Sequence, residues 1–311
     1  MRLLIYIVFL ISIQLQAQCP FINLGSDVTI PCGDSCTTIA ADYLETYETT
    51  SYAVSQIPYN PDPYNVGTLV TTPIDDRWSP VLNLPFTFCF FGQTYNQYVV
   101  GTNGIISFNL AYANQFCPWA FNAALPSTAL PRSMIGLYHD IDPSVAGDVY
   151  YNIYGSYPCR RLVVSFYNTA HFACNSLISN FQIIIYELTN IIEIHIERKQ
   201  TCNTWNGGRA CLGIQNTAGT TSYAPPGRNT GAYTINTPEA WRLAPSGTPT
   251  YAFNWLNTNN TNPIYPHCYQ SDSTLIGRVI YNVCGGGQIT KYDTVNVSRQ
   301  EYGFGLGISI N

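Results

Sequence analysis

Residues 99–108 read Val99-Val100-Gly101-Thr102-Asn103-Gly104-Ile105-Ile106-Ser107-Phe108, which is two strand-like runs joined by a Gly-Thr-Asn-Gly turn. Asn and Gly tolerate positive φ at little cost, so Asn103-Gly104 between β-branched and aromatic residues is a strong hairpin signal. We interpret the polar groups of this turn as structural rather than catalytic. The stretch therefore predicts an antiparallel, all-β, extracellular module.

Short β-branched and aromatic runs recur along the chain, whereas helical periodicity is almost absent. We expect strands at 86–91, 134–138, 149–154, 162–167, 181–186, 191–196 and 212–215, and one or two helical turns around 110–116. Alternation in the 191–197 run assigns Ile192, Ile194 and Ile196 to the core face and Glu193, His195 and Glu197 to the wet face. Many short strands at this spacing predict an antiparallel β-sandwich with Greek-key connections.

The chain divides into several expected segments. An apolar run after Arg2 that ends in Leu15-Gln16-Ala17 is typical of a signal peptide, so 1–17 is assigned to export and Gln18 to the mature start. A Pro-, Gly- and Ser-rich stretch at 245–249 predicts a linker. The expected parts are 18–85 as the N-terminal β segment of the first domain, 86–244 as its sandwich, 250–298 as a smaller Ig-like β domain, and 299–311 as a further or truncated segment.

Composition limits the partners and the compartment. Charged residues make up only 10% of the chain and the formal net charge is −5, which argues against nucleic acid and anionic membranes as partners. Eleven cysteines in a chain with an export signal favour disulfides. Local pairing predicts Cys89 with Cys117, Cys159 with Cys174, Cys202 with Cys211, and Cys268 with Cys284.

Five motifs in order resemble a known family. They are Gly101 to Phe108, Gly136 to Pro143, Phe181 to Glu187, Trp205 to Gly208 and Gly213 to Asn216. Together they are similar to the N-terminal region of gliding-motility-associated, adhesin-like surface proteins of Bacteroidetes, and more distantly to nidogen-type domains. Residues 250–298 resemble the PKD- or Ig-like repeats that follow in such proteins. The resemblance implies a secreted or surface-displayed adhesin exported by a type IX system.

The best candidate for chemistry is the acidic stretch around His139-Asp140-Ile141-Asp142-Pro143. Asp140, Asp142 and Asp148 together offer carboxylate oxygens that suit calcium. The alternative is that these acids cap a strand end and form Asx turns before Pro143. No metal-binding or nucleophile motif accompanies the four histidines, so no catalytic residue and no cofactor other than possible calcium is assigned.

Aromatic residues in loop-like surroundings are the second candidate. Trp78, Trp119 and Trp205 have flat rings that could bind a sugar or a protein partner, or could simply cover loops and strand edges. We therefore expect an adhesin-like binding module without catalytic activity, whose partner is an extracellular protein or glycan. It is expected to make no membrane insertion after signal cleavage. Two alternatives stay open: a secreted polysaccharide-acting enzyme with Asp140 and Asp142 as its acids, and a structural stalk or filament subunit. The oligomeric state also stays open.

Overall fold

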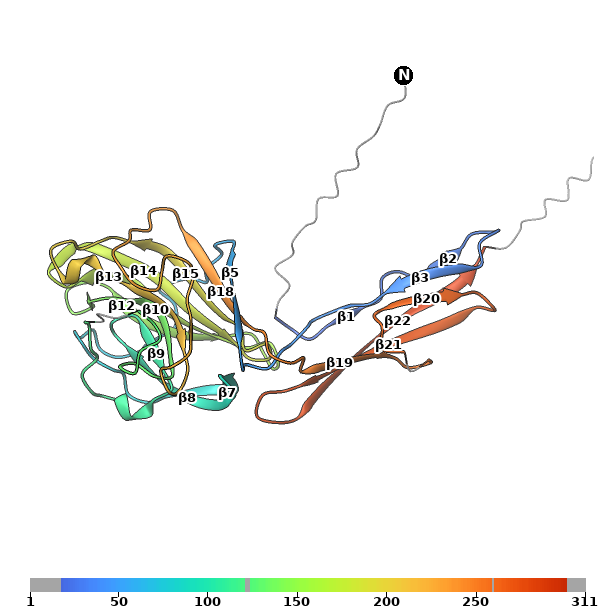
Figure 1. Cartoon of the computed structure of the whole chain (residues 1–311), viewed down its shortest axis with the longest axis horizontal. Coiled ribbons are helices and arrows are strands. Elements are labelled where there is room, and N and C mark those ends of the chain that lie inside the picture. Colours follow the sequence, from blue (N-terminus) through green and yellow to red (C-terminus); the bar gives the residue numbers. More distant parts are fainter. Residues whose placement is uncertain (1–17, 121–123, 259, 301–311) are drawn as a thin grey trace, which may run out of the picture.

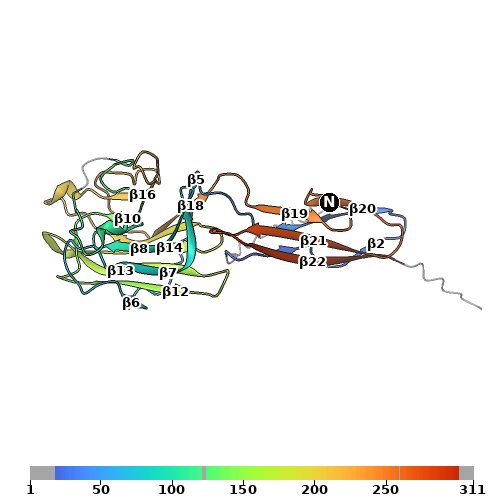
Figure 2. The same cartoon turned by 90° about the horizontal axis from the view of Figure 1, so that it is seen from below.

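The computed structural model describes residues 18–120, 124–258 and 260–300, and their regular structure is almost entirely β (Figure 1). The expected signal peptide 1–17 and nearly all of the expected last segment lie outside these residues. The described chain forms two β units that follow one another along the long axis of the molecule (Figures 1 and 2). Within it, none of the helical segments has the length and apolar character that a membrane span requires.

The larger unit is an antiparallel sandwich of two sheets. The first sheet has the order β17 (Ser222–Tyr223), β16 (Cys211–Gln215), β10 (Ser133–Tyr138), β9 (Ile105–Ser107), β8 (Gln93–Gly101) and β7 (Leu82–Phe90). The second has the order β5 (Tyr52–Ile57), β18 (Glu239–Pro245), β15 (Ile192–Lys199), β14 (Cys174–Tyr186), β13 (Arg161–His171), β12 (Asp148–Tyr154) and β6 (Thr68–Leu69), with β11 (Ile141–Asp142) also paired to β13. Apolar side chains from both sheets form one buried core. The all-β sandwich is therefore confirmed, and each of the seven expected strand runs overlaps an observed strand.

The predicted hairpin at residues 99–108 is present. β8 and β9 pair with Val99 opposite Ser107 and Gly101 opposite Ile105. The loop closes with a hydrogen bond from the Gly104 N–H to the Gly101 carbonyl, and Gly104 has a φ of 89°. The only regular helix around residues 110–116 is a single 3₁₀ turn, Leu110–Tyr112.

The smaller unit is built from both ends of the described chain. Its main sheet has the order β19 (Tyr251–Trp255), β21 (Ser273–Asn282), β22 (Gln288–Arg299) and β2 (Val28–Ile30), and two further pairs join β20 (Ile264–Cys268) to β3 (Cys36–Ala40) and β1 (Ile22–Asn23) to β4 (Asp42–Tyr43). We expected residues 18–85 to belong to the sandwich domain, but residues 22–43 belong to the smaller unit. The reason is that β2 and β3 complete the sheets of β22 and β20, and Ile30 and Ile39 fill the core around Trp255.

Two connectors, which lie side by side, link the units. Residues 46–51 and 246–250 exchange main-chain hydrogen bonds, including Glu48 N–H to the Thr248 carbonyl and Thr250 N–H to the Thr46 carbonyl. A disulfide between Cys89 on β7 and Cys284 after β21 crosses the same junction. The sandwich is thus inserted into the smaller unit and fastened to it.

The disulfides differ from the local pairs that we predicted. The structure pairs Cys19 with Cys159, Cys36 with Cys268, Cys89 with Cys284, and Cys174 with Cys202, and leaves Cys32, Cys117 and Cys211 as thiols. Cys159 and Cys174 lie beyond opposite ends of the 11-residue strand β13, about 35 Å apart along the strand, so they cannot bond to each other. Local pairing fails because strands far apart in sequence bring these cysteines together.

Candidate functional site

Three carboxylates converge at one end of the sandwich. Asp75 and Asp76 lie in the loop before β7, and Asp140 follows β10. One oxygen from each side chain lies within 4.8 Å of the others. Of the calcium ligands expected from the sequence, only Asp140 belongs to this group. The Asp142 Oδ1 instead accepts hydrogen bonds from the N–H and hydroxyl of Ser144, and Asp148 accepts one from the Tyr150 hydroxyl.

The Gly-Thr-Asn-Gly turn holds this acidic site in place. Thr102 exchanges two hydrogen bonds with the backbone of Arg77, which fixes the loop that carries Asp75 and Asp76. The Asn103 Nδ2 donates to the Asp76 Oδ1 at 2.8 Å, and the Asn103 Oδ1 accepts the Ile141 N–H at 3.0 Å. Sequence reasoning identified this turn as structural but missed Asp75 and Asp76. The available signal was that they are the only two adjacent acidic residues in the chain.

Burial and mutual repulsion disfavour negative charge in this acidic site. Burial, with added repulsion from Asp76 and Asp75, raises the pKa of Asp140 to about 7, although the Trp205 indole N–H opposes this by donating to the Asp140 Oδ2 at 2.7 Å. Burial and the charges of Asp76 and Asp142 raise the pKa of Asp75 to about 6. Burial also raises the pKa of Asp76, against the hydrogen bond from Asn103. A bound cation would favour the charged form of these carboxylates and so offset the shifts.

A buried polar cluster lies next to Asp140. The Nε2 atoms of His139 and His171 are 3.3 Å apart, and the Ser179 hydroxyl lies 3.2 Å and 2.9 Å from them. Burial lowers the pKa of both histidines, that of His171 to about 4, and burial lowers the pKa of nearby Lys199 to about 8. His171 is 1% exposed, because β14 and β11 enclose it.

Two of the three expected ligand-binding tryptophans meet. The Trp119 and Trp205 rings lie with centroids 5.3 Å apart, and Phe172 lies 5.0 Å from Trp205. All three rings are partly exposed, and we call them the aromatic patch. Trp78 is different: it is 1% exposed and stacked on Tyr112, so it is a core residue that no ligand can reach.

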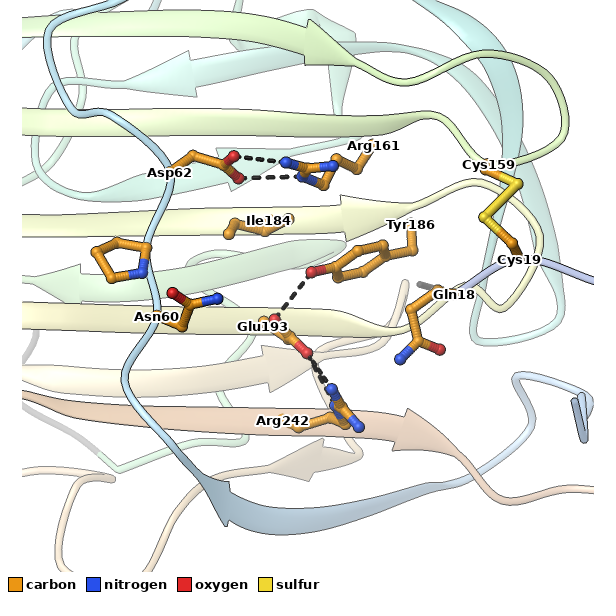
Figure 3. Close-up of a pocket in the computed structure, with 11 residues that line it drawn as sticks. Gln18, Cys19, Asn60, Asp62, Cys159, Arg161, Ile184, Tyr186, Glu193 and Arg242 are labelled. Atoms are coloured by element: carbon orange, nitrogen blue, oxygen red, sulfur yellow. Dashed lines mark hydrogen bonds and ion pairs between the residues drawn. A yellow bond between two sulfur atoms is a disulfide. The ribbon is translucent and has the colours of Figure 1, made fainter. Parts of the chain in front are cut away.

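The outer face of β15 is covered rather than wet. Residues 58–66, which we call the strap, cross this face between β5 and β6 (Figure 3). The Asn60 N–H donates to the His195 Nδ1, and the Asp62 N–H and carbonyl bond to the Gln182 side chain. Glu193 and His195 are therefore only 2% and 1% exposed, against our expectation for that face, whereas Glu197 is exposed as expected.

A cavity of about 220 Å³ opens beside the strap (Figure 3). Its charged groups pair with one another: Arg161 with Asp62, and Arg242 with Glu193, which also accepts a hydrogen bond from the Tyr186 hydroxyl. The Cys19–Cys159 disulfide and Gln18 border one end. Because these charges already satisfy each other, we assign this cavity a structural role in fastening the strap.

Comparison with protein families gives one match. The NIDO-related family model matches residues 49–267, which contain the whole sandwich and end within β20. Searches of the curated proteins and of the solved structures find no significant match. Since the matched segment covers well over half of the 311 residues, the chain belongs to the NIDO-related, that is nidogen-related, family.

Proposed function

We propose that this chain is a secreted or cell-surface, adhesin-like binding module without catalytic activity, whose partner is an extracellular protein or glycan. The nidogen-related domain and the four disulfides indicate an extracellular binding or structural module. The finer assignment, an adhesin of Bacteroidetes with a PKD- or Ig-like second unit and type IX export, belongs to the same proposal. It is supported by the order of the five sequence motifs.

The observation that carries the proposal is the aromatic patch. Trp119, Phe172 and Trp205 come from three separate loops, yet their rings gather at one end of the sandwich and remain partly exposed. Large aromatic side chains dominate the energetics of binding surfaces, because each offers a wide apolar area at small entropic cost. A second support is the low charge of the chain, which suits a partner recognised through rings, hydroxyls and amides.

The small space around Asp140 supports a role without catalysis. The cavity between Asp140, His171 and Trp205 measures only about 10 Å³. That is room for about one water molecule, and no sugar ring fits it. The polysaccharide-acting alternative needs substrate at Asp140, so it would require this end of the sandwich to open.

Binding to a glycan array and to extracellular proteins tests the proposal. We expect the full chain to bind at least one member of these sets, and Trp119→Ala to weaken that binding about 10-fold or more. Tyr292→Ala is the matched control, because Tyr292 is 58% exposed but lies on β22 in the smaller unit. Absence of binding to every glycan and protein tested, or equal binding by Trp119→Ala, contradicts the proposal. Glycan cleavage by the wild type would favour the enzyme instead.

A further inference from the structure

The acidic site has carboxylate oxygens that nothing in the described chain satisfies. Asp140 is 6% exposed, and its Oδ1 is sealed from solvent with no hydrogen-bond partner. The same holds for the Asp75 Oδ1. The five ion pairs formed among the described residues all lie elsewhere. A buried carboxylate oxygen without a donor or counter-charge is strongly unfavourable, so such atoms normally face a ligand.

The surrounding side chains hold these oxygens in position. Trp205 donates to the other oxygen of Asp140, and Asn103 donates to Asp76, so these two acids are each oriented by a neutral donor from outside the site. Outer contacts of this kind are typical of metal sites, where they fix the direction of the ligating atoms. Neither donor carries a positive charge, so the site keeps its need for a cation.

We propose that Asp75, Asp76 and Asp140 bind one calcium ion. The donors are all carboxylate oxygens, which hard cations prefer. The oxygens of the three acids lie within 4.8 Å of one another, which agrees with the spread of about 4.6–5.2 Å that the oxygens around one calcium ion can have. The neighbouring His139 takes no part, because its Nδ1 contacts the Leu137 carbonyl and its Nε2 faces His171 and Ser179.

Calcium at this position would join two distant parts of the chain. Asp75 and Asp76 precede β7, whereas Asp140 follows β10, so one ion bridges the two segments. Through Asp140 it also reaches the Trp205 indole, a member of the aromatic patch. The ion would therefore fix the ring that the proposed function uses; this consequence rests on that function, whereas the ion site itself does not.

Calcium binding to the full chain, without any partner, tests the inference directly. After treatment with chelator and desalting, titration with CaCl₂ followed by calorimetry is expected to give one site with a Kd of about 10⁻⁴–10⁻³ M, the range of extracellular calcium modules. TbCl₃ is expected to give luminescence on tryptophan excitation, because Trp205 contacts Asp140. The melting temperature should rise with CaCl₂ and fall back with chelator.

Variants of the proposed ligands distinguish calcium binding at this site from general effects of calcium on the protein. Asp75→Asn and Asp140→Asn should each lose at least 10-fold in calcium affinity, while Asp148→Asn should bind as the wild type does. In chelator Asp140→Asn should melt no lower than the wild type, because it removes an unpaired buried charge. The inference is overturned if the wild type shows neither heat nor a melting shift with CaCl₂, if both variants keep the wild-type affinity, or if Mg²⁺ or Zn²⁺ binds and Ca²⁺ does not. Partner binding with Trp119→Ala is measured separately, so either proposal can fail alone.

Discussion

Asn103 is fully buried, and its carboxamide joins three segments that are distant in sequence. It donates to Asp76 and to the Cys117 carbonyl, and it accepts the N–H of Ile141. The hairpin was predicted because Asn and Gly both tolerate positive φ, and in this turn Gly104 takes the positive φ whereas Asn103 does not. The side chain of Asn103 therefore matters here more than its backbone freedom.

Gly104 is the residue at which this turn is most sensitive to substitution. A Cβ at Gly104 would lie 2.2 Å from the Leu137 carbonyl oxygen, at a φ that L residues rarely adopt. We expect Gly104→Ala to lower the free energy of unfolding by about 2–5 kcal/mol. Gly92→Ala is the control, since its φ is 74° but nothing lies within 4 Å, and it should cost only about 1 kcal/mol. Urea unfolding measures both, and equal losses would contradict the steric argument.

The acidic site shows how far single residues could be predicted from the sequence. Asp140 could be identified because it ends a strand in an acid-rich motif. Asp75 and Asp76 could not be connected with it, because the contact depends on Thr102 holding the backbone of Arg77, a pairing across 25 residues. Trp78 was misjudged for a related reason: its loop-like sequence hides the fact that the chain packs over it.

At the scale of elements, alternation identified the core face of β15 but not the burial of its other face. Ile192, Ile194 and Ile196 are buried as expected. Glu193 and His195 are buried too, because the strap covers them. A periodicity of two separates the faces of a strand, but it cannot reveal whether a distant segment lies across the polar one. The charged residues on that face are thus part of a second, polar layer.

Glu193 gives the strap face its pH dependence. Burial alone would raise the pKa of Glu193, but the hydrogen bond from His195 and the charge of Arg242 outweigh it, so the pKa lies below its ordinary value of 4.5. A carboxylate whose pKa is lowered by folding stabilises the fold above the unfolded pKa, and this contribution is lost as the pH falls through the folded value. Protonation of Glu193 should therefore weaken its ion pair with Arg242 only at acidic pH.

We expect Glu193→Gln to lower the free energy of unfolding by about 2–3 kcal/mol at pH 7, because it leaves Arg242 without its charged partner. The difference from the wild type should shrink as the pH falls below about 4.5. Glu197→Gln, on the exposed part of the same strand, is the control and should change stability little. Denaturant unfolding from pH 7 to pH 3 measures the three proteins. A difference that stays constant with pH would contradict the assigned charge effect.

At the scale of the whole molecule, the order of the units in space differs from their order in sequence. The smaller unit begins before the sandwich and ends after it, so its core depends on residues about 270 positions apart, such as Ile30 and Val297. Local patterns predicted a small β domain at 250–298, where β19, β21 and nearly all of β22 lie. They could not predict that β2 and β3 complete it, because nothing local in residues 22–43 marks them as distant partners.

The Cys89–Cys284 disulfide should keep the two units in a fixed relation. Leu188 from the sandwich also packs on Val279 and Tyr281 at the junction. We expect the Cys89→Ser, Cys284→Ser double variant to broaden the distribution of dimensions in small-angle X-ray scattering and to speed proteolysis near residues 246–250. The Cys36→Ser, Cys268→Ser double variant lies within the smaller unit and should leave the junction unchanged. Identical scattering and proteolysis in the wild type and the first variant would contradict this prediction.

The paired connectors have a consequence for how such a molecule could arise. Ser51 and Ser246, where the chain enters and leaves the sandwich, lie side by side with their hydroxyls 3.0 Å apart. A host whose loop is cut at one point can accept a guest domain with adjacent ends without rearranging its own strands. The nidogen-related module thus has the geometry of a cassette: one gene insertion could add it to a small β scaffold, and one short turn could replace it.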